Sequence, residues 1–113
     1  MHLKSFSMIE TKPESGVYVL SAAYDFLPVN VLLPEDREEL ALTMNERKAG
    51  FRRSDFMKYA EECGIPQEAA KKIIDTVLSA GDDLLNMCNE SYLPEDLKES
   101  LKVLIAGRCS RLE

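Results

Sequence analysis

The chain has 113 residues, a net charge of −6 and a hydrophobic fraction of 45%, as expected for one ordinary globular domain. The acidic balance argues against a direct nucleic-acid surface, because phosphate binding needs clustered Lys and Arg. No apolar run approaches the roughly 20 residues that span a bilayer, and the N-terminal sequence has no signal-peptide pattern. We therefore expect a cytoplasmic protein with no membrane partner.

The first 25 residues predict a β-hairpin. Residues 6–10 and 17–21 are rich in β-branched and aromatic side chains and read as strands. Residues 11–16 carry Pro and Gly at positions that favour a turn. A hairpin brings its two ends together, so we expect Ser5 to lie near Asp25, where a carboxylate is available to a metal.

Residues 26–53 give weaker signals. Two prolines interrupt the apolar stretch 26–34 and oppose a regular helix there, which predicts an ordered loop. Residues 39–44 are ambiguous, since Leu and Ala also suit a helix. Asn45 and Gly50, which are turn-favouring residues, follow this run. Together with the resemblance described below, they favour a short strand over residues 39–44.

Three helices are predicted after this loop, over residues 54–63, 66–89 and 94–111. Ser54 is a possible N-cap for the first, Gly64 is a natural stop, and prolines stand near the starts of the other two. The sequence therefore predicts an α+β fold in a single domain, residues 1–113, with a small β portion before a three-helix portion.

The second predicted helix has a wide apolar arc, and Gly81 is a weak point where it can bend. One apolar stripe, expected to pack in a core, consists of Ala69, Ile73, Val77, Ala80, Leu84 and Met87. A second set widens the arc: Ala70, Ile74, Leu78, Leu85 and Cys88. This apolar arc is wider than the surface that one partner helix normally covers.

The chain has three cysteines, Cys63, Cys88 and Cys109. They are widely spaced and form no Cys-x-x-Cys pair, so a zinc site is not expected. All three fall in helical patterns among apolar neighbours, which favours free, buried, unreactive thiols.

Several short motifs resemble the active-site segment of HipA-type serine/threonine kinases, the toxin kinases of bacterial toxin–antitoxin pairs. The catalytic loop of that family reads Asp-x-His-x-Lys-Asn-Phe-Ser, and residues 2–7 (HLKSFS) match its His, Lys, Phe and Ser. Residues 24–25 (YD) match the Tyr-Asp pair that follows the family's hairpin. Residues 40–45 (LALTMN) and 54–56 (SDF) also resemble the family. The resemblance covers most of the chain but only the final part of a kinase.

The resemblance implies roles for individual residues. Asp25 and Ser5 would stand at the two positions that hold Mg²⁺, and Lys4 would lie near the transferring phosphate. His2 and Tyr24 would be structural members of the active-site loop. From spacing alone Asp25 is better explained as a turn carboxylate, and it is the family pattern that favours a vestigial or partial metal site. Lys4 is alternatively an exposed strand lysine, and Ser5 is alternatively a plain strand residue.

Departures from the family pattern predict that the chain is inactive by itself. The catalytic Asp would sit just before Met1, Ser5 replaces the family's Asn, and the phosphate-covering loop, the nucleotide-binding Lys and the N-lobe are absent. Phosphoryl transfer depends on positioning and charge stabilisation by those parts. ATP and Mg²⁺ therefore belong to the parent kinase, and we expect this chain to bind neither.

Two functions follow from the resemblance. The first is the C-terminal fragment of a HipA-like kinase, whose implied partner is a DNA-binding antitoxin. The alternative is a stand-alone, non-catalytic protein-binding module, a decayed kinase remnant. In either case we expect the isolated chain to form a homo-oligomer, because its hairpin and helix stripes would otherwise leave apolar surface bare.

Overall fold

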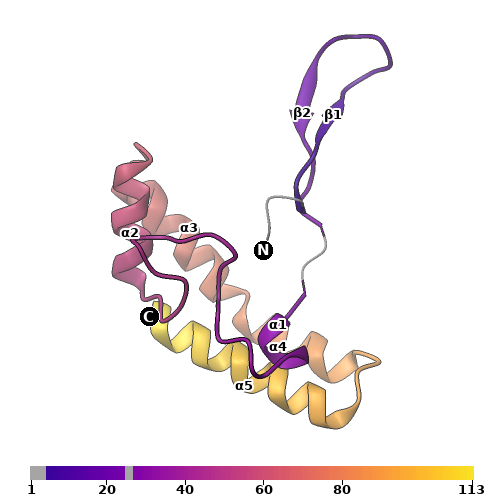
Figure 1. The fold of residues 1–113 in the computed structure, drawn as a ribbon, viewed down its shortest axis with the longest axis vertical. Coiled ribbons are helices and arrows are strands. Elements are labelled where there is room, and N and C mark those ends of the chain that lie inside the picture. Colours follow the sequence, from indigo (N-terminus) through magenta and orange to yellow (C-terminus); the bar gives the residue numbers. More distant parts are fainter. Residues whose placement is uncertain (1–4, 25–26) are drawn as a thin grey trace.

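The computed structural model describes residues 5–24 and 27–113, and it combines a β-hairpin with a group of helices (Figure 1). The elements in chain order are β1 (Met8–Glu10), β2 (Tyr18–Leu20), α1 (Val29–Leu32), α2 (Arg53–Glu62), α3 (Gln67–Ser79), α4 (Gly81–Glu90) and α5 (Glu95–Leu112). This confirms the predicted α+β class. None of the helices in the described ranges combines the length and apolar character needed to cross a bilayer.

The hairpin is antiparallel and extends away from the helices (Figure 1). Its register places Met8 opposite Leu20, Ile9 opposite Val19 and Glu10 opposite Tyr18. Large apolar side chains on both faces stay exposed: Phe6, Met8, Ile9, Val17, Tyr18, Val19 and Leu20. A two-stranded hairpin without a packed face is only marginally stable in water by itself.

The start of α2 differs from the prediction in its cap. Arg52, not Ser54, is the N-cap, and Ser54 lies inside the helix. The Asp55 carboxylate accepts the Arg52 N–H at 2.8 Å, which satisfies a backbone donor at the helix start. The acidic residue expected at this positive end is therefore confirmed.

Gly64 ends α2 as predicted, because its φ of 72° is a left-handed conformation that suits glycine. The Ile65 N–H then returns to the Ala60 carbonyl at 2.8 Å. Pro66 precedes α3 directly and serves as its N-cap residue. The short connection places α2 against α3.

The prediction of one helix over residues 66–89 was wrong, because the helix divides at Ala80 into α3 and α4. Gly81 begins α4, and a Cβ built there would lie 3.5 Å from the Cys109 Sγ of α5. That distance is an ordinary van der Waals contact, so packing does not require glycine here, and the poor helix propensity of glycine accounts for the break. The structure therefore has four helices after residue 52, not three.

The buried residues favour the second of the two apolar sets. Ala70, Ile74 and Cys88 are buried, whereas Ile73, Val77 and Met87 remain more than half exposed. The expectation that the stripe through Ile73 and Val77 packs in a core was wrong. The full buried apolar set is Val31, Met44, Phe51, Ala60, Ala70, Ile74 and Cys88.

The cysteine prediction holds in part. All three thiols are free, and Cys88 is buried. Cys63 is exposed at the C-terminal end of α2, and Cys109 is half-buried. The expectation that Cys63 is buried was therefore wrong.

Helix α5 connects the helical group, since it packs against α1, α3 and α4 (Figure 1). Its C-terminal end also meets α2, where Arg53 donates to the Leu112 carbonyl at 3.2 Å. Arg53 pairs with Asp75 of α3 at 2.6 Å as well. One arginine thus links the start of α2 to both α3 and α5.

The loop of residues 33–52 contains no strand, so the strand predicted over residues 39–44 was wrong. An isolated bridge joins Met44 and Arg47 across a turn, and Asn45 has a φ of 50°. The Glu39 N–H bonds to the Lys48 carbonyl at 2.7 Å, so the chain folds back locally and forms no ladder. The helical turn α1, within the stretch predicted as an ordered loop, was not predicted.

Candidate active-site hairpin

The two ends of the hairpin are held together by backbone and hydroxyl groups. The Tyr24 N–H donates to the Ser5 carbonyl at 3.1 Å, and the Ser21 N–H donates to the Ser7 carbonyl at 2.7 Å. The Ser7 N–H donates to the Ser21 hydroxyl at 3.0 Å, and the hydroxyls of Ser7 and Tyr24 share a hydrogen bond. Ser5 and Tyr24 therefore lie together at the open end of the hairpin, whereas Asp25, the residue predicted to lie near Ser5, falls outside the described residues.

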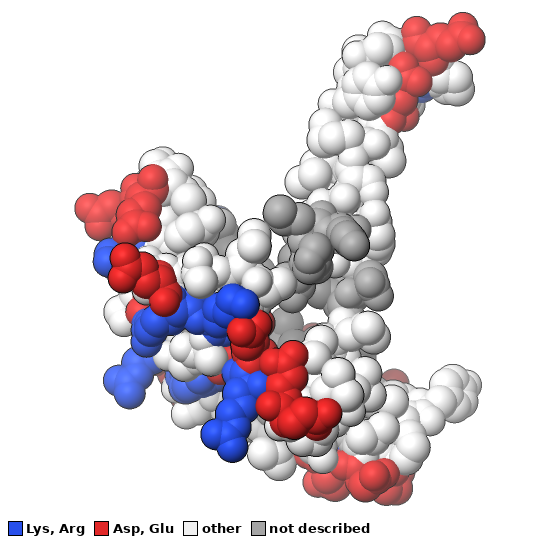
Figure 2. All heavy atoms as spheres, in the orientation of Figure 1, with Lys and Arg blue, Asp and Glu red and all other residues white. Residues whose placement is uncertain are grey.

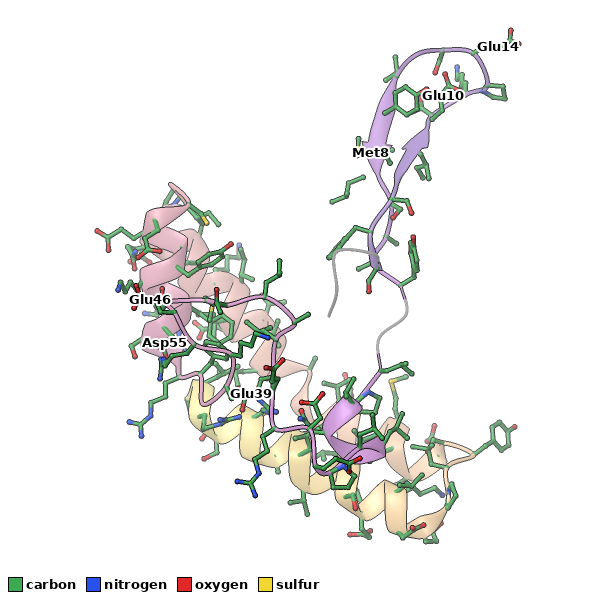
Figure 3. The ribbon with its side chains drawn as sticks, in the orientation of Figure 1. Met8, Glu10, Glu14, Glu39, Glu46 and Asp55 are labelled. Carbon is green, nitrogen blue, oxygen red and sulfur yellow. The ribbon has the colours of Figure 1, made fainter. Side chains whose placement is uncertain are left out.

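The turn at the other end of the hairpin is fixed by one carboxylate. Glu10 accepts the Gly16 N–H at 2.6 Å and the Glu14 N–H at 3.1 Å (Figure 3). Glu14 and Gly16 have φ values of 60° and 67°, which Gly16 adopts without steric cost. Hydrogen bonds to the Glu10 side chain of the same hairpin thus stabilise the turn predicted over residues 11–16.

The sequence-predicted site residues divide into two groups. Ser5 is 3% exposed, and Tyr24 is exposed at the open end of the hairpin. His2, Lys4 and Asp25 lie outside the described residues. The structure therefore brings Ser5 and Tyr24 together and leaves the roles of the other three as predictions.

The donor set in the described part of the chain does not fit a tight metal site. Residues 5–24 and 27–113 hold no group of three His, Cys, Asp or Glu side chains that could bind an ion. Ser5, the predicted ligand that is described, is a neutral hydroxyl on a buried residue. Mg²⁺ prefers carboxylate oxygens as protein ligands and usually keeps several bound waters, which need space at the site.

Two further motifs of the resemblance meet in space. The Asn45 amide donates to the Asp55 carbonyl at 3.0 Å, and Arg47 forms an ion pair with the Asp55 carboxylate. The hydrogen bond from the Arg52 N–H holds the pKa of Asp55 below its usual value, with further lowering by the Arg47 guanidinium and an opposing effect of desolvation. The turn after residue 43 is thus fixed to the start of α2. Within the described ranges the buried Asn45 Oδ1 has no partner.

A half-buried carboxylate, Glu39, forms an ion-pair cluster that the sequence did not predict (Figure 3). Its side chain is 12% exposed and pairs with Arg108 and with Arg111, the latter at 2.8 Å. Arg108 also donates to the Asn30 amide oxygen at 3.1 Å. These bonds join the loop and α1 to α5. The spacing of Arg108 and Arg111 could have indicated a site for a carboxylate, because it places both side chains on one face of a helix.

The pKa of Glu39 lies below its ordinary value of 4.5. Burial acts to raise this pKa, but the opposing contributions together outweigh it. They are the hydrogen bond from Arg111, the backbone N–H groups of Gly50 and Phe51 and the charge of Arg108. Glu39 is therefore ionised over the neutral range.

Basic residues in the described ranges are mostly paired with acids. Figure 2 shows blue and red atoms side by side over the helical part of this face. Beyond the pairs already described, Lys48 pairs with Glu38 at 2.9 Å. Arg47 and Lys48 lie in an exposed turn with ion pairs, and no broad basic surface appears on this face (Figure 2).

These features define an α+β protein whose N-terminal hairpin joins two halves of a candidate active site. The family model of the HipA-like C-terminal domain matches residues 1–84. Since the match covers most of the chain, the chain belongs to the HipA-like C-terminal domain family. The match ends within α4, and α5 lies beyond it. No curated protein matches the chain.

Proposed function

We propose that the chain is the C-terminal segment of a HipA-like serine/threonine protein kinase toxin. The complete kinase would transfer the γ-phosphate of ATP to a Ser or Thr of a protein. The observation that carries this proposal is the hydrogen bond from the Tyr24 N–H to the Ser5 carbonyl at 3.1 Å. It brings together the two ends of the active-site pattern, where Lys4 and Asp25 are the adjoining residues in the sequence.

The 113 residues are catalytically incomplete under this proposal. The family pattern places its catalytic Asp two residues before the histidine, and His2 is preceded here by Met1 alone. The phosphate-covering loop and nucleotide-binding Lys are also outside these residues. Since phosphoryl transfer relies on positioned charge, the remaining Lys4 and Asp25 do not suffice.

Mg²⁺ and ATP belong to the parent kinase in this proposal. Mg²⁺ would neutralise charge on the phosphates when bound. Asp25 would be its carboxylate ligand and Ser5 a weaker one, because a short hydroxyl replaces an amide. We expect the metal to bind this chain weakly, because one carboxylate and one hydroxyl leave most Mg²⁺ ligands to water.

The partner that a kinase of this type implies is a DNA-binding antitoxin. Contact with DNA would then run through the antitoxin, consistent with the net charge of −6 on this chain. A cytoplasmic site of action would follow from ATP as the phosphate donor.

Incubation of the chain with labelled ATP, Mg²⁺ and a general protein acceptor tests catalytic incompleteness. We expect no transfer above that of the Asp25→Ala variant, because the catalytic Asp and the phosphate loop are missing. The matched control is Asp82→Ala, which removes an exposed carboxylate on α4. Transfer that scales with chain concentration, vanishes in Asp25→Ala and persists in Asp82→Ala would contradict this expectation.

One observation favours the second candidate, a non-catalytic protein-binding module. The hairpin presents apolar side chains on both faces, with Met8, Tyr18 and Leu20 all more than half exposed. Contiguous exposed apolar surface commonly marks an interaction site. A binding module would use this hairpin directly, whereas a kinase segment would bury it against preceding residues of the parent protein.

A further inference from the structure

The hydrogen-bond pattern of the hairpin identifies the backbone groups on its outer edge. Ser21 bonds to Ser7, and the Thr11 N–H donates to the Val17 carbonyl at 2.9 Å. In an antiparallel ladder, bonded and non-bonded pairs alternate, so the intervening bonded pair is residues 9 and 19. The N–H and C=O groups of residues 18 and 20 consequently point outward from β2.

The outer edge of β2 lacks the features that normally prevent strand pairing. Natural edges carry Lys, Pro or a bulge, or are covered. The outward residues of β2 are Tyr18 and Leu20, which are uncharged and 56% and 62% exposed. No hydrogen bond joins their backbone groups to another segment within residues 5–24 and 27–113. The edge of β1, in contrast, ends at the charged Glu10.

We propose that, in the isolated 113-residue chain, β2 pairs antiparallel with β2 of a second copy, about a two-fold axis at Val19. Tyr18 then lies opposite Leu20 of the second copy, and Leu20 lies opposite its Tyr18. Both pairs consist of residues with outward backbone groups, so each pair exchanges two backbone hydrogen bonds. The interface is isologous, as a symmetric dimer requires.

Side chains complement this pairing on both faces. Tyr18 and Leu20 form aromatic–aliphatic cross-strand pairs on one face, and the two Val19 side chains meet on the other. Ile9 lies beside Val19 and widens the second apolar face. The resulting sheet has four strands, which exceeds the minimum of about three for a stable apolar sheet.

The distribution of charge also favours a second copy as the occupant. The charged residues of the hairpin, Glu10, Lys12 and Glu14, lie at or near the turn (Figure 3). In an antiparallel arrangement about Val19 the two turns point in opposite directions. The acidic tips are therefore kept apart, and an uncharged segment meets an uncharged segment.

Sedimentation of the full chain over a range of concentrations tests this pairing. We expect a monomer–dimer equilibrium in the wild type. Leu20→Pro should raise the dissociation constant about 10-fold or more, because it removes an outward donor from each copy. The matched control, Met8→Pro, removes an outward donor from β1 and should change the constant less than about 3-fold.

Two further measurements separate pairing from loss of the hairpin. Amide exchange at Ile9 and Val19 reports whether the hairpin remains folded in each variant. Tyr18→Lys retains every backbone group but places a charge beside Leu20 of the second copy, and it should also weaken the dimer about 10-fold. In mixed labelled and unlabelled samples, NMR should detect contacts between the Tyr18 ring of one copy and the Leu20 methyls of the other.

Several outcomes would overturn the pairing. The pairing is refuted if the chain stays monomeric at about millimolar concentration. It is also refuted if Leu20→Pro and Met8→Pro raise the dissociation constant equally, or if Tyr18→Lys leaves the dissociation constant unchanged. Loss of the dimer in Ile73→Glu but not in Leu20→Pro would assign the contact to the exposed face of α3. A monomer that instead binds a foreign extended peptide would assign the edge to another partner.

Discussion

Phe51→Ala should lower the free energy of unfolding by about 3–4 kcal/mol, the largest effect expected of a single substitution in this chain. Phe51 is 4% exposed, and its ring packs edge-on against Phe56 with centroids 6.0 Å apart. The Arg47 guanidinium lies 5.7 Å from the same ring centre. The substitution therefore leaves a cavity and removes an aromatic pair and a cation–π contact.

Urea unfolding followed by circular dichroism, at one fixed protein concentration, measures this effect. Tyr92→Ala is the control, since the Tyr92 side chain is fully exposed and its loss should cost less than about 0.5 kcal/mol. Equal losses in the two variants would show that the loop carrying Phe51 does not pack on α2 as described.

Glu39→Gln should lower the free energy of unfolding by about 1–2 kcal/mol. Exposed ion pairs contribute about 0–1 kcal/mol, and breaking a fully buried pair costs about 3–5 kcal/mol. Glu39 lies between these limits, because it is 12% exposed while Arg108 and Arg111 are about one-third exposed. The control is Glu38→Gln, which removes a more exposed ion pair to Lys48 and should cost less than about 0.5 kcal/mol.

The pH dependence of Glu39→Gln gives a second readout. Because the folded pKa of Glu39 is below 4.5, the folded chain releases this proton more readily than the unfolded chain. The stabilisation is complete above pH 4.5 and is lost as pH falls through the folded pKa. The difference between wild type and Glu39→Gln should therefore shrink below pH 4.5. A difference that stays constant down to pH 3 would show that the carboxylate charge is not responsible.

The hairpin was the most predictable part of the fold, because its signals are local. The turn residues before Gly16 and the β-branched strands specify it without help from the rest of the chain. The end of α2 at Gly64 and the proline before α3 were predictable for the same reason. Each of these features depends on the conformational limits of one residue.

The features that sequence reading missed depend on tertiary contacts. The glycine at position 81 indicated a weak point, but it did not show that the helix ends at Ala80 and restarts as α4. The buried face of α3 was misassigned because Ile73 and Ile74 are equally apolar, and only packing distinguishes them. Glu39 pairs with residues more than 60 positions away, so the helical spacing of Arg108 and Arg111 does not by itself identify Glu39 as their partner.

The candidate site was predictable as far as its local geometry. Ser5 and Tyr24 meet because the hairpin requires it, whereas the burial of Ser5 was not foreseen. A family pattern supplies residue types at positions but not the exposure of those residues. That exposure determines whether a hydrated ion can reach Ser5.

The nucleotide sequence immediately upstream of the Met1 codon tests the central claim, that the chain is a segment of a HipA-like kinase. The proposal predicts an open reading frame that continues upstream, with an Asp codon directly before Met1 and a Lys-bearing nucleotide-binding lobe further upstream. A stop codon and a ribosome-binding site in that position would contradict it and support the stand-alone binding module.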